Sequence, residues 1–166
     1  MPVTPFHFGP GAALHAVAPR QVSFLGFCVA NVLIDCESLY NLVQGHYPVH
    51  AFFHTYVGAS LMALVVILLF VTARGLADRM PLPDLFRWKS LSVTAVTVGG
   101  LLGAWSHVLL DSIMHADIRP LAPFSSANAF LHLVSLDMLH LACLVLGGLG
   151  LLVVLLRSRI EKKNSP

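Results

Sequence analysis

The sequence predicts an all-α integral membrane protein with about four long transmembrane helices. Hydrophobic residues make up 57% of the 166-residue chain and charged residues only 11%. Four apolar runs are each close to the ~20 residues that a helix needs to cross a bilayer. Lysine and arginine lie almost entirely at the ends of these runs, as membrane topology requires. We expect one helical membrane domain over residues 1–166.

The expected elements follow from the positions at which polar residues, glycine and proline interrupt the apolar runs. A short helix over residues 9–18 comes first, with Gly9-Pro10 suited to its start, and should pack against the first span. Residues 74–89 form a basic loop and residues 158–166 a charged tail. The spans are expected at residues 22–40, 52–73, 90–115 and 138–157. In the third span, Gly99, Gly100 and Gly103 would allow close helix contact.

Single residues suggest three further local features. Pro48 suits a first helical turn, and the helix that it opens would carry His50 and His54 on one face of its first two turns. Residues 127–134 could form a short interfacial helix. Asp137 suits the N-cap of the last span.

The basic residues predict the orientation of the chain in the membrane. Nine of the ten lie on one side of a four-span topology, and only Arg119 lies on the other. The positive-inside rule then places the 74–89 loop and the C-terminus in the cytoplasm. Because the net charge is only +2 and no basic stripe exists, we do not expect nucleic acid as a partner. A membrane lipid is the expected partner.

Histidine and aspartate gather at the outer ends of the expected spans. Asp35 lies toward the outer end of the first span, and His107 and Asp111 share a helix face in the third. If the short helix folds back on the first span, His7 comes level with Asp35, and eight of the nine histidines then lie in the outer half. Ionisable side chains inside a span are energetically unfavourable, so their default interpretation is functional.

These residues offer the nitrogen and carboxylate ligands that zinc or manganese prefers, without a thiolate. Because the candidates exceed the four ligands of a structural zinc, we expect one open site, or two metals about 3.5–4 Å apart bridged by Asp111. Asp35 or His54 could accept a proton from a metal-bound water, with Asp111 as the third catalytic residue, and Arg119 could bind a phosphate. The candidate ligands are His7, Asp35, His50, His54, His107 and Asp111.

Simpler interpretations stay open for several of these residues. His7 could be an interfacial residue near a frayed terminus, and His50 an exposed loop histidine. The histidine and aspartate of the third span could form a hydrogen bond that joins two helices. Arg119 could be an ordinary arginine at headgroup level.

Four nearby polar residues have less specific expected roles. His115 and Asp117 could be further ligands or could mark the exit of the third span. Asn31 is expected to make a hydrogen bond between helices or to a ligand. Glu37 should point away from Asp35, toward the membrane interface.

Several motifs together resemble one known family. The runs Ser106-His107-x-Leu109-Leu110-Asp111-Ser112 and Ile118-Arg119-Pro120-Leu121-x-Pro123-Phe124-Ser125 are similar to the bacterial membrane-bound metal-dependent hydrolase family, known from LexA-regulated inner-membrane proteins. Further landmarks over residues 5–126 are Pro5-Phe6-His7-Phe8, Asn31-Val32-Leu33-Ile34-Asp35 and His50-x-x-x-His54-Thr55. That family is distantly similar to zinc-dependent phospholipase C and P1 nuclease.

The resemblance implies a bacterial inner-membrane location and a set of metal ligands. They are His7, Asp35, one of His50 and His54, His107, and Asp111 as the bridge. Family members often have Pro-Asp-x-Asp where this chain has Leu33-Ile34-Asp35-Cys36, so one carboxylate is missing here.

Two functional hypotheses follow. The first is a metal-dependent hydrolase of a phosphoester or phospholipid-like substrate at the non-cytoplasmic face, in which the metal lowers the pKa of a bound water to about 7. The alternative is a non-catalytic membrane protein that binds or relays a metal ion or protons through the His/Asp cluster. The inner halves of the spans hold chiefly small and aliphatic residues, which disfavours a path through the membrane. A purely structural polar cluster is a third interpretation.

Overall fold

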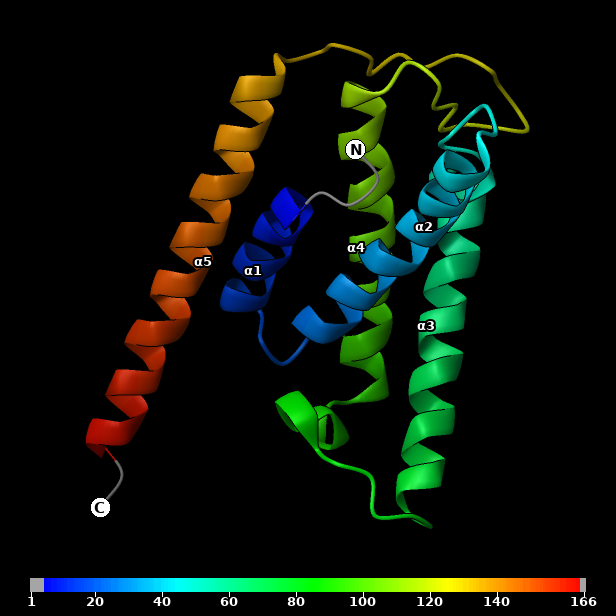
Figure 1. Ribbon diagram of the computed structural model, residues 1–166. Coiled ribbons are helices and arrows are strands. Elements are labelled where there is room, and N and C mark those ends of the chain that lie inside the picture. The colour runs from blue at the N-terminus through cyan, green and yellow to red at the C-terminus, as the bar shows by residue number, and fades with distance from the viewer. Residues whose placement is uncertain (1–4, 165–166) are drawn as a thin grey trace.

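A computed structural model describes residues 5–164 of the chain (Figure 1). This part of the chain contains helices and no strand. Four helices are long and apolar enough to cross a membrane, which confirms the expected fold class. They are α2 (Phe24–Gln44), α3 (Tyr56–Ala77), α4 (Val93–Met114) and α5 (Leu136–Asn164). The shorter elements are α1 (Phe8–Val17) and the 3-10 turns η1 (Pro5–His7), η2 (Phe52–His54) and η3 (Leu85–Ser90).

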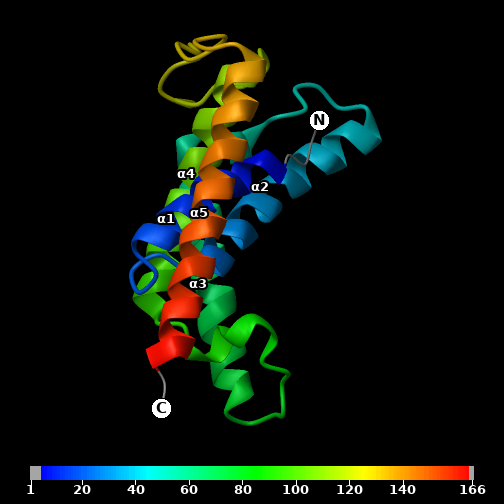
Figure 2. The same cartoon turned by 90° about the vertical axis from the view of Figure 1, so that its left-hand side faces the viewer.

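The α4 helix lies at the centre of the helix arrangement. The α2 and α3 helices pack against α4, and α1 packs mainly against α5. In both views α2 runs obliquely to the other long helices (Figures 1 and 2). The short helix was expected to pack against the first span, and α1 does contact α2, but its larger contact is with α5.

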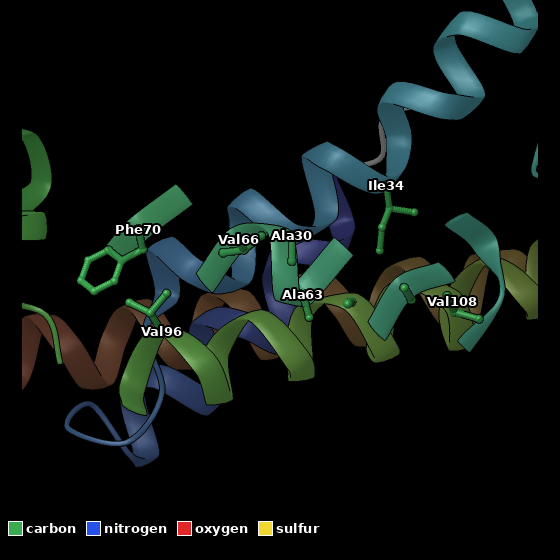
Figure 3. Close-up of a cluster of buried hydrophobic side chains, with 9 residues drawn as sticks. Ala30, Ile34, Ala63, Val66, Phe70, Val96 and Val108 are labelled. Atoms are coloured by element: carbon green, nitrogen blue, oxygen red, sulfur yellow. The ribbon is translucent and has the colours of Figure 1, made fainter. Parts of the chain in front are cut away.

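A small-residue core joins α2, α3 and α4 (Figure 3). Its side chains are mostly alanine and valine, so the helix axes can come close together. Where lipid surrounds the helices, such packing takes the place of the hydrophobic effect in holding them together. The core consists of Ala30, Ile34, Ala59, Ala63, Val66, Phe70, Val96, Ala104 and Val108.

Two glycines of α4 allow the closest contact with α2. A Cβ atom on Gly99 would lie 2.2 Å from the carbonyl oxygen of Ser23, and one on Gly103 would lie 2.5 Å from that of Phe27. The expected close helix contact is therefore confirmed at these two positions. Gly100 differs, because a Cβ atom there would lie 3.7 Å from the side chain of Val66, an ordinary contact with α3.

The start of the second span differs from the prediction. The Oγ1 atom of Thr55 accepts a hydrogen bond from the backbone N–H of Gly58, and this cap begins α3 at Tyr56. His50 therefore lies in the preceding loop and His54 in η2, rather than on the first two helical turns. The N-cap at Thr55, rather than Pro48, decides where the helix begins.

Other helix ends also differ from the prediction. The α2 helix continues to Gln44 and ends at Gly45, whose positive φ of 68° closes it. Ser135 rather than Asp137 caps α5, since the backbone N–H of Met138 donates to its Oγ atom at 3.4 Å. Asp137 lies in the first turn of α5 instead. Residues 127–134 form turns and bends rather than a short helix.

The two ends of the bundle differ in their loops. The loops 45–55 and 115–135 lie at the upper end in Figure 1. The α3–α4 loop and the C-terminal end of α5 lie at the lower end, and the α1–α2 turn is directed toward it. Arg119 therefore lies at the upper end, and the other nine basic residues belong to segments at or near the lower end.

Candidate metal centre

Five of the six predicted metal ligands come together in the upper half of the bundle. They come from four separate elements: His7 from η1, Asp35 from α2, His54 from η2, and His107 and Asp111 from α4. Each is at most 6% exposed. His107 precedes the last residue of α4 by seven positions, which places it about 10 Å below the upper end of that helix.

Four of these residues form a tight group, which we call the inner group: Asp35, His54, His107 and Asp111. Each offers one ligand atom, and these atoms all lie within 4.8 Å of one another. His107 Nε2 lies 3.3 Å from both Asp35 Oδ1 and Asp111 Oδ2. His54 Nε2 lies 3.4 Å from Asp111 Oδ2. Two atoms bound about 2.1 Å from one tetrahedral ion lie about 3.4 Å apart, so the inner group could bind a divalent metal.

Neighbouring polar groups orient the histidines of the inner group. The His107 Nδ1–H donates to Asn31 Oδ1 at 2.9 Å, and the Asn31 amide donates to the carbonyl oxygen of Gly103 at 3.3 Å. This arrangement leaves His107 Nε2 free for the inner group, as in many metal sites. It also confirms the expected hydrogen bond of Asn31 between helices.

Glu37 occupies a place that the sequence did not predict. Its carboxylate accepts hydrogen bonds from the backbone N–H groups of Phe52 at 3.1 Å and Phe53 at 2.7 Å. It also lies 3.9 Å from His54 Nδ1. Glu37 therefore faces η2 and holds the turn that carries His54, and the expectation that it points to the interface is wrong. The difference arises because the 45–55 loop passes over α2 and brings η2 next to Glu37. The helical spacing between Asp35 and Glu37 could not predict this contact.

His7 contacts two members of the inner group, His107 and Asp111. Its Nδ1 atom is 3.1 Å from His107 Nδ1, and its Nε2 atom is 3.1 Å from Asp111 Oδ1. The expected approach of His7 to the site thus occurs, but through α4 rather than beside Asp35. Being 3% exposed, His7 is not an interfacial residue.

His50 is also buried, at 6% exposed, so it is not an exposed loop histidine. Its Nδ1 atom lies 2.9 Å from Asp117 Oδ1, and its ring stacks on His115 with centroids 4.1 Å apart. The burial of Asp117 alone would raise its pKa, but hydrogen bonds from His50 outweigh this effect and lower the pKa below its ordinary value. Burial lowers the pKa of His115 to about 4, so that its ring is neutral near pH 7.

A pocket of about 430 Å³ opens beside His50 at the upper end of the bundle. Arg119 is exposed and lines this pocket together with His50 and Asp117, so the predicted phosphate-binding residue lies next to the cluster. The other lining residues are mostly apolar: Tyr47, Pro48, Ala51, Phe52, Thr55, Ala116, Ala122 and Pro123.

Three other histidines make contacts outside the cluster. His15 Nδ1 lies 2.7 Å from the carbonyl oxygen of Val22, near the turn between α1 and α2. His140 stacks on Phe6, and His46 packs edge-on against Tyr40. None of them belongs to the inner group.

Comparisons with protein-family models, with curated proteins and with solved structures gave no significant match for this chain.

Proposed function

We propose that this protein is a membrane-bound metal-dependent hydrolase that acts on a phosphoester or phospholipid-like substrate at the non-cytoplasmic face. One observation carries the proposal: a buried group of two histidines and two aspartates lies next to His50, which lines a pocket together with Arg119. Buried ionisable groups without a lysine or arginine partner need another counter-charge, and a divalent cation supplies it.

Zinc is the metal that we propose for the inner group, with manganese as the second choice. The group offers imidazole nitrogens and carboxylate oxygens, and none of the three cysteines belongs to it. When bound, such a metal supplies a water of lowered pKa and stabilises negative charge on a phosphoryl oxygen.

The surrounding side chains would orient the substrate and accept the proton. Asp35 faces His107 and His54 through Oδ1, which leaves its Oδ2 atom as the proton acceptor that we favour over His54. Arg119 would bind the substrate phosphate at the mouth of the pocket, since a guanidinium matches phosphate geometry. The apolar wall of the pocket would hold the lipid part.

The proposed orientation places the pocket outside the cytoplasm, in the inner membrane of a bacterium. It is supported by the nine basic residues in segments at or near the lower end of the bundle and the single arginine at the upper end. The resemblance to membrane-bound hydrolases supports the same location.

The relay alternative finds less support in the lower half of the bundle. There the buried core between α2, α3 and α4 consists of apolar residues such as Ala30, Val66, Phe70 and Val96. A proton or ion path would need polar side chains through this layer. The site is therefore best explained as accessible from the upper end.

The proposal can be tested with the purified protein in detergent and in phospholipid vesicles. We expect zinc-dependent release of phosphate or headgroup from a panel of phospholipids and from phosphatidic acid, and loss of this release in Asp111→Asn. His46→Ala is the matched control, because His46 is exposed and lies outside the cluster. Arg119→Ala should raise KM for the lipid more than it lowers kcat. Full activity in Asp111→Asn, or no hydrolysis of any member by zinc-loaded protein, would contradict the proposal.

A further inference from the structure

A cavity of about 690 Å³ opens toward the lower end of the bundle, opposite the end that carries the candidate metal centre. Residues 19–21, in the turn between α1 and α2, line one side of it. Side chains from the last part of α5 line the other side. The cavity therefore lies between α5 and the α1–α2 turn, and none of its lining residues belongs to the His/Asp cluster.

Among the residues that the structure describes, the charged side chains that line this cavity are Arg20 and Arg157. Arg157 is half-buried, and its Nη2 atom donates a hydrogen bond to the carbonyl oxygen of Ala16 at 3.1 Å. Ala16 lies in the last turn of α1, where carbonyl groups have no partner within the helix. The hydrogen bond fixes the guanidinium beside the cavity and leaves most of its five N–H donors for a ligand. Closing α1 explains this contact of Arg157 but not the position of Arg20 in the same cavity.

Three apolar side chains of α5 line the cavity beside the arginines. They are Val153, Leu156 and Ile160, which are 40%, 50% and 61% exposed. Their spacing of three and four residues places them on one face of α5. The apolar span of this helix runs from Leu136 to Ile160, so this face borders the hydrocarbon of the membrane. A ligand that fits both parts of the cavity has an anionic group and a hydrocarbon chain.

The guanidinium of Arg157 lies at the depth of a lipid headgroup. Arg157 precedes the last residue of the α5 span by three positions, which corresponds to about 4.5 Å along the helix. Its methylene stem can lie along the apolar face while the charged group stays at the membrane surface. A guanidinium binds phosphate through two parallel hydrogen bonds, and basic pockets between membrane helices on the cytoplasmic side bind the headgroups of anionic lipids.

We propose that Arg20 and Arg157 bind the phosphate of an anionic phospholipid, at a place here called the lower lipid site. The acyl chain of this lipid would lie on Val153, Leu156 and Ile160. Under the proposed orientation of the chain, the lipid belongs to the cytoplasmic leaflet. It is not the substrate of the proposed hydrolase, because the candidate substrate pocket lies at the other end of the bundle. The inference goes beyond the proposed function and requires neither a metal nor a catalytic activity.

A lipid bound to both arginines would connect two parts of the molecule. The α5 helix contacts chiefly α1 and η1, and Arg20 follows α1 in the turn that leads to α2. One phosphate between Arg20 and Arg157 would hold the lower part of α5 close to this turn. Because a ligand that binds only the folded protein stabilises it, an anionic lipid should raise the temperature of unfolding.

Native mass spectrometry of the detergent-purified protein tests the lower lipid site. The probes are phosphatidylglycerol and phosphatidylcholine with identical acyl chains. We expect the wild type to retain phosphatidylglycerol more strongly, and Arg20→Gln and Arg157→Gln each to bind it about fivefold more weakly. Because Arg20 is exposed, its substitution should leave the fold intact even if the loss of the Arg157 hydrogen bond disturbs α1. Arg159→Gln is the matched control and should leave the affinity unchanged, since Arg159 is exposed on the same helix and does not line the cavity.

The temperature of unfolding gives a second measurement. Phosphatidylglycerol should raise it in the wild type but not in an Arg20→Gln/Arg157→Gln double variant, and phosphatidylcholine and inorganic phosphate should raise it in neither. Equal affinity of the wild type for the two lipids, or an equal loss of affinity in Arg159→Gln, would overturn the lower lipid site. Stabilisation by inorganic phosphate as large as that by phosphatidylglycerol would also overturn it, because the cavity would then bind a simple anion.

Discussion

The helices α4 and α5 are both long enough to cross a membrane, yet they occupy very different places in the molecule. Over their apolar windows α4 is 44% buried and α5 only 17%. The α4 helix contacts α2 and α3 and carries His107 and Asp111, whereas α5 contacts chiefly α1 and η1. The α5 helix has the higher mean hydropathy, 2.6 against 1.6 for α4, and it is also the more exposed of the two.

This difference shows which residues mark the interior of a membrane protein. Lipid tails are as apolar as leucine, so apolar side chains gain little from contact with another helix. Small residues such as Gly99 and Gly103 allow close packing, and polar residues such as His107 and Asp111 must find partners inside the bundle. The α5 helix is more uniformly apolar over its spanning part and therefore tolerates contact with lipid.

The largest effect is expected from the substitution His107→Ala in α4. It removes the only inner-group residue whose Nε2 atom lies within 3.3 Å of both aspartates, and metal affinity should fall more than about 100-fold, or about 3 kcal/mol. Competition with a zinc-binding dye measures this change. Unchanged zinc affinity in a folded His107→Ala variant would show that His107 is not a metal ligand.

Gly103→Leu and Gly148→Leu compare the packing of the two helices. Gly103 faces the backbone of Phe27, while a Cβ atom on Gly148 of α5 would meet nothing within 4 Å. We expect Gly103→Leu to lower the free energy of unfolding by about 2–3 kcal/mol, and Gly148→Leu to change it by less than about 0.5 kcal/mol. Unfolding in mixed detergent micelles measures both. Equal effects would show that the face of α5 that carries Gly148 is packed as closely as the Gly103 face of α4.

Asn31→Ala should have an intermediate effect on the metal site. It removes the acceptor that orients His107 but leaves every proposed ligand in place. Metal affinity should therefore fall about 10–100-fold, less than in His107→Ala. Asn31→Asp, which keeps an acceptor oxygen, should restore most of the affinity. An affinity loss in Asn31→Asp as large as in Asn31→Ala would show that this hydrogen bond does not orient the ring.

The smallest effect is expected on α5. Leu152 is 50% exposed in the lower part of this helix. Because lipid replaces the lost contacts, Leu152→Ala should change the free energy of unfolding by less than about 0.5 kcal/mol and should not change metal affinity. A loss above about 2 kcal/mol would indicate that a further protein surface covers this face of α5.

Much of the fold and part of the site could be predicted from the hydropathy of the sequence and from the free-energy cost of burying charged side chains. Four spans follow from apolar length, and His107 and Asp111 follow from their spacing inside one of them. The role of Gly103 in close packing follows from the absence of a side chain. These features depend on local sequence and on the bilayer alone.

The contacts of Glu37 and Asp117 could not be predicted because they depend on the paths of two loops. Tyr56, the first residue of α3 after the 45–55 loop, donates its backbone N–H to the carbonyl oxygen of Pro120 in the 115–135 loop at 2.9 Å. This contact lies between segments more than sixty residues apart in the sequence. The spacing of His50 from His54 predicted that both lie on one helix. Because of the paths of these loops, His50 instead lies before the helix and contacts Asp117.

The central claim, that the buried His/Asp cluster is a metal site, is tested most directly by the metal content of the detergent-purified protein. Mass spectrometry should find one or two equivalents of zinc or manganese in the wild type and in His46→Ala, and none in a folded Asp111→Ala variant. The wild type without stoichiometric metal, even after reconstitution with zinc and manganese, would contradict the claim and leave a proton-linked or structural cluster.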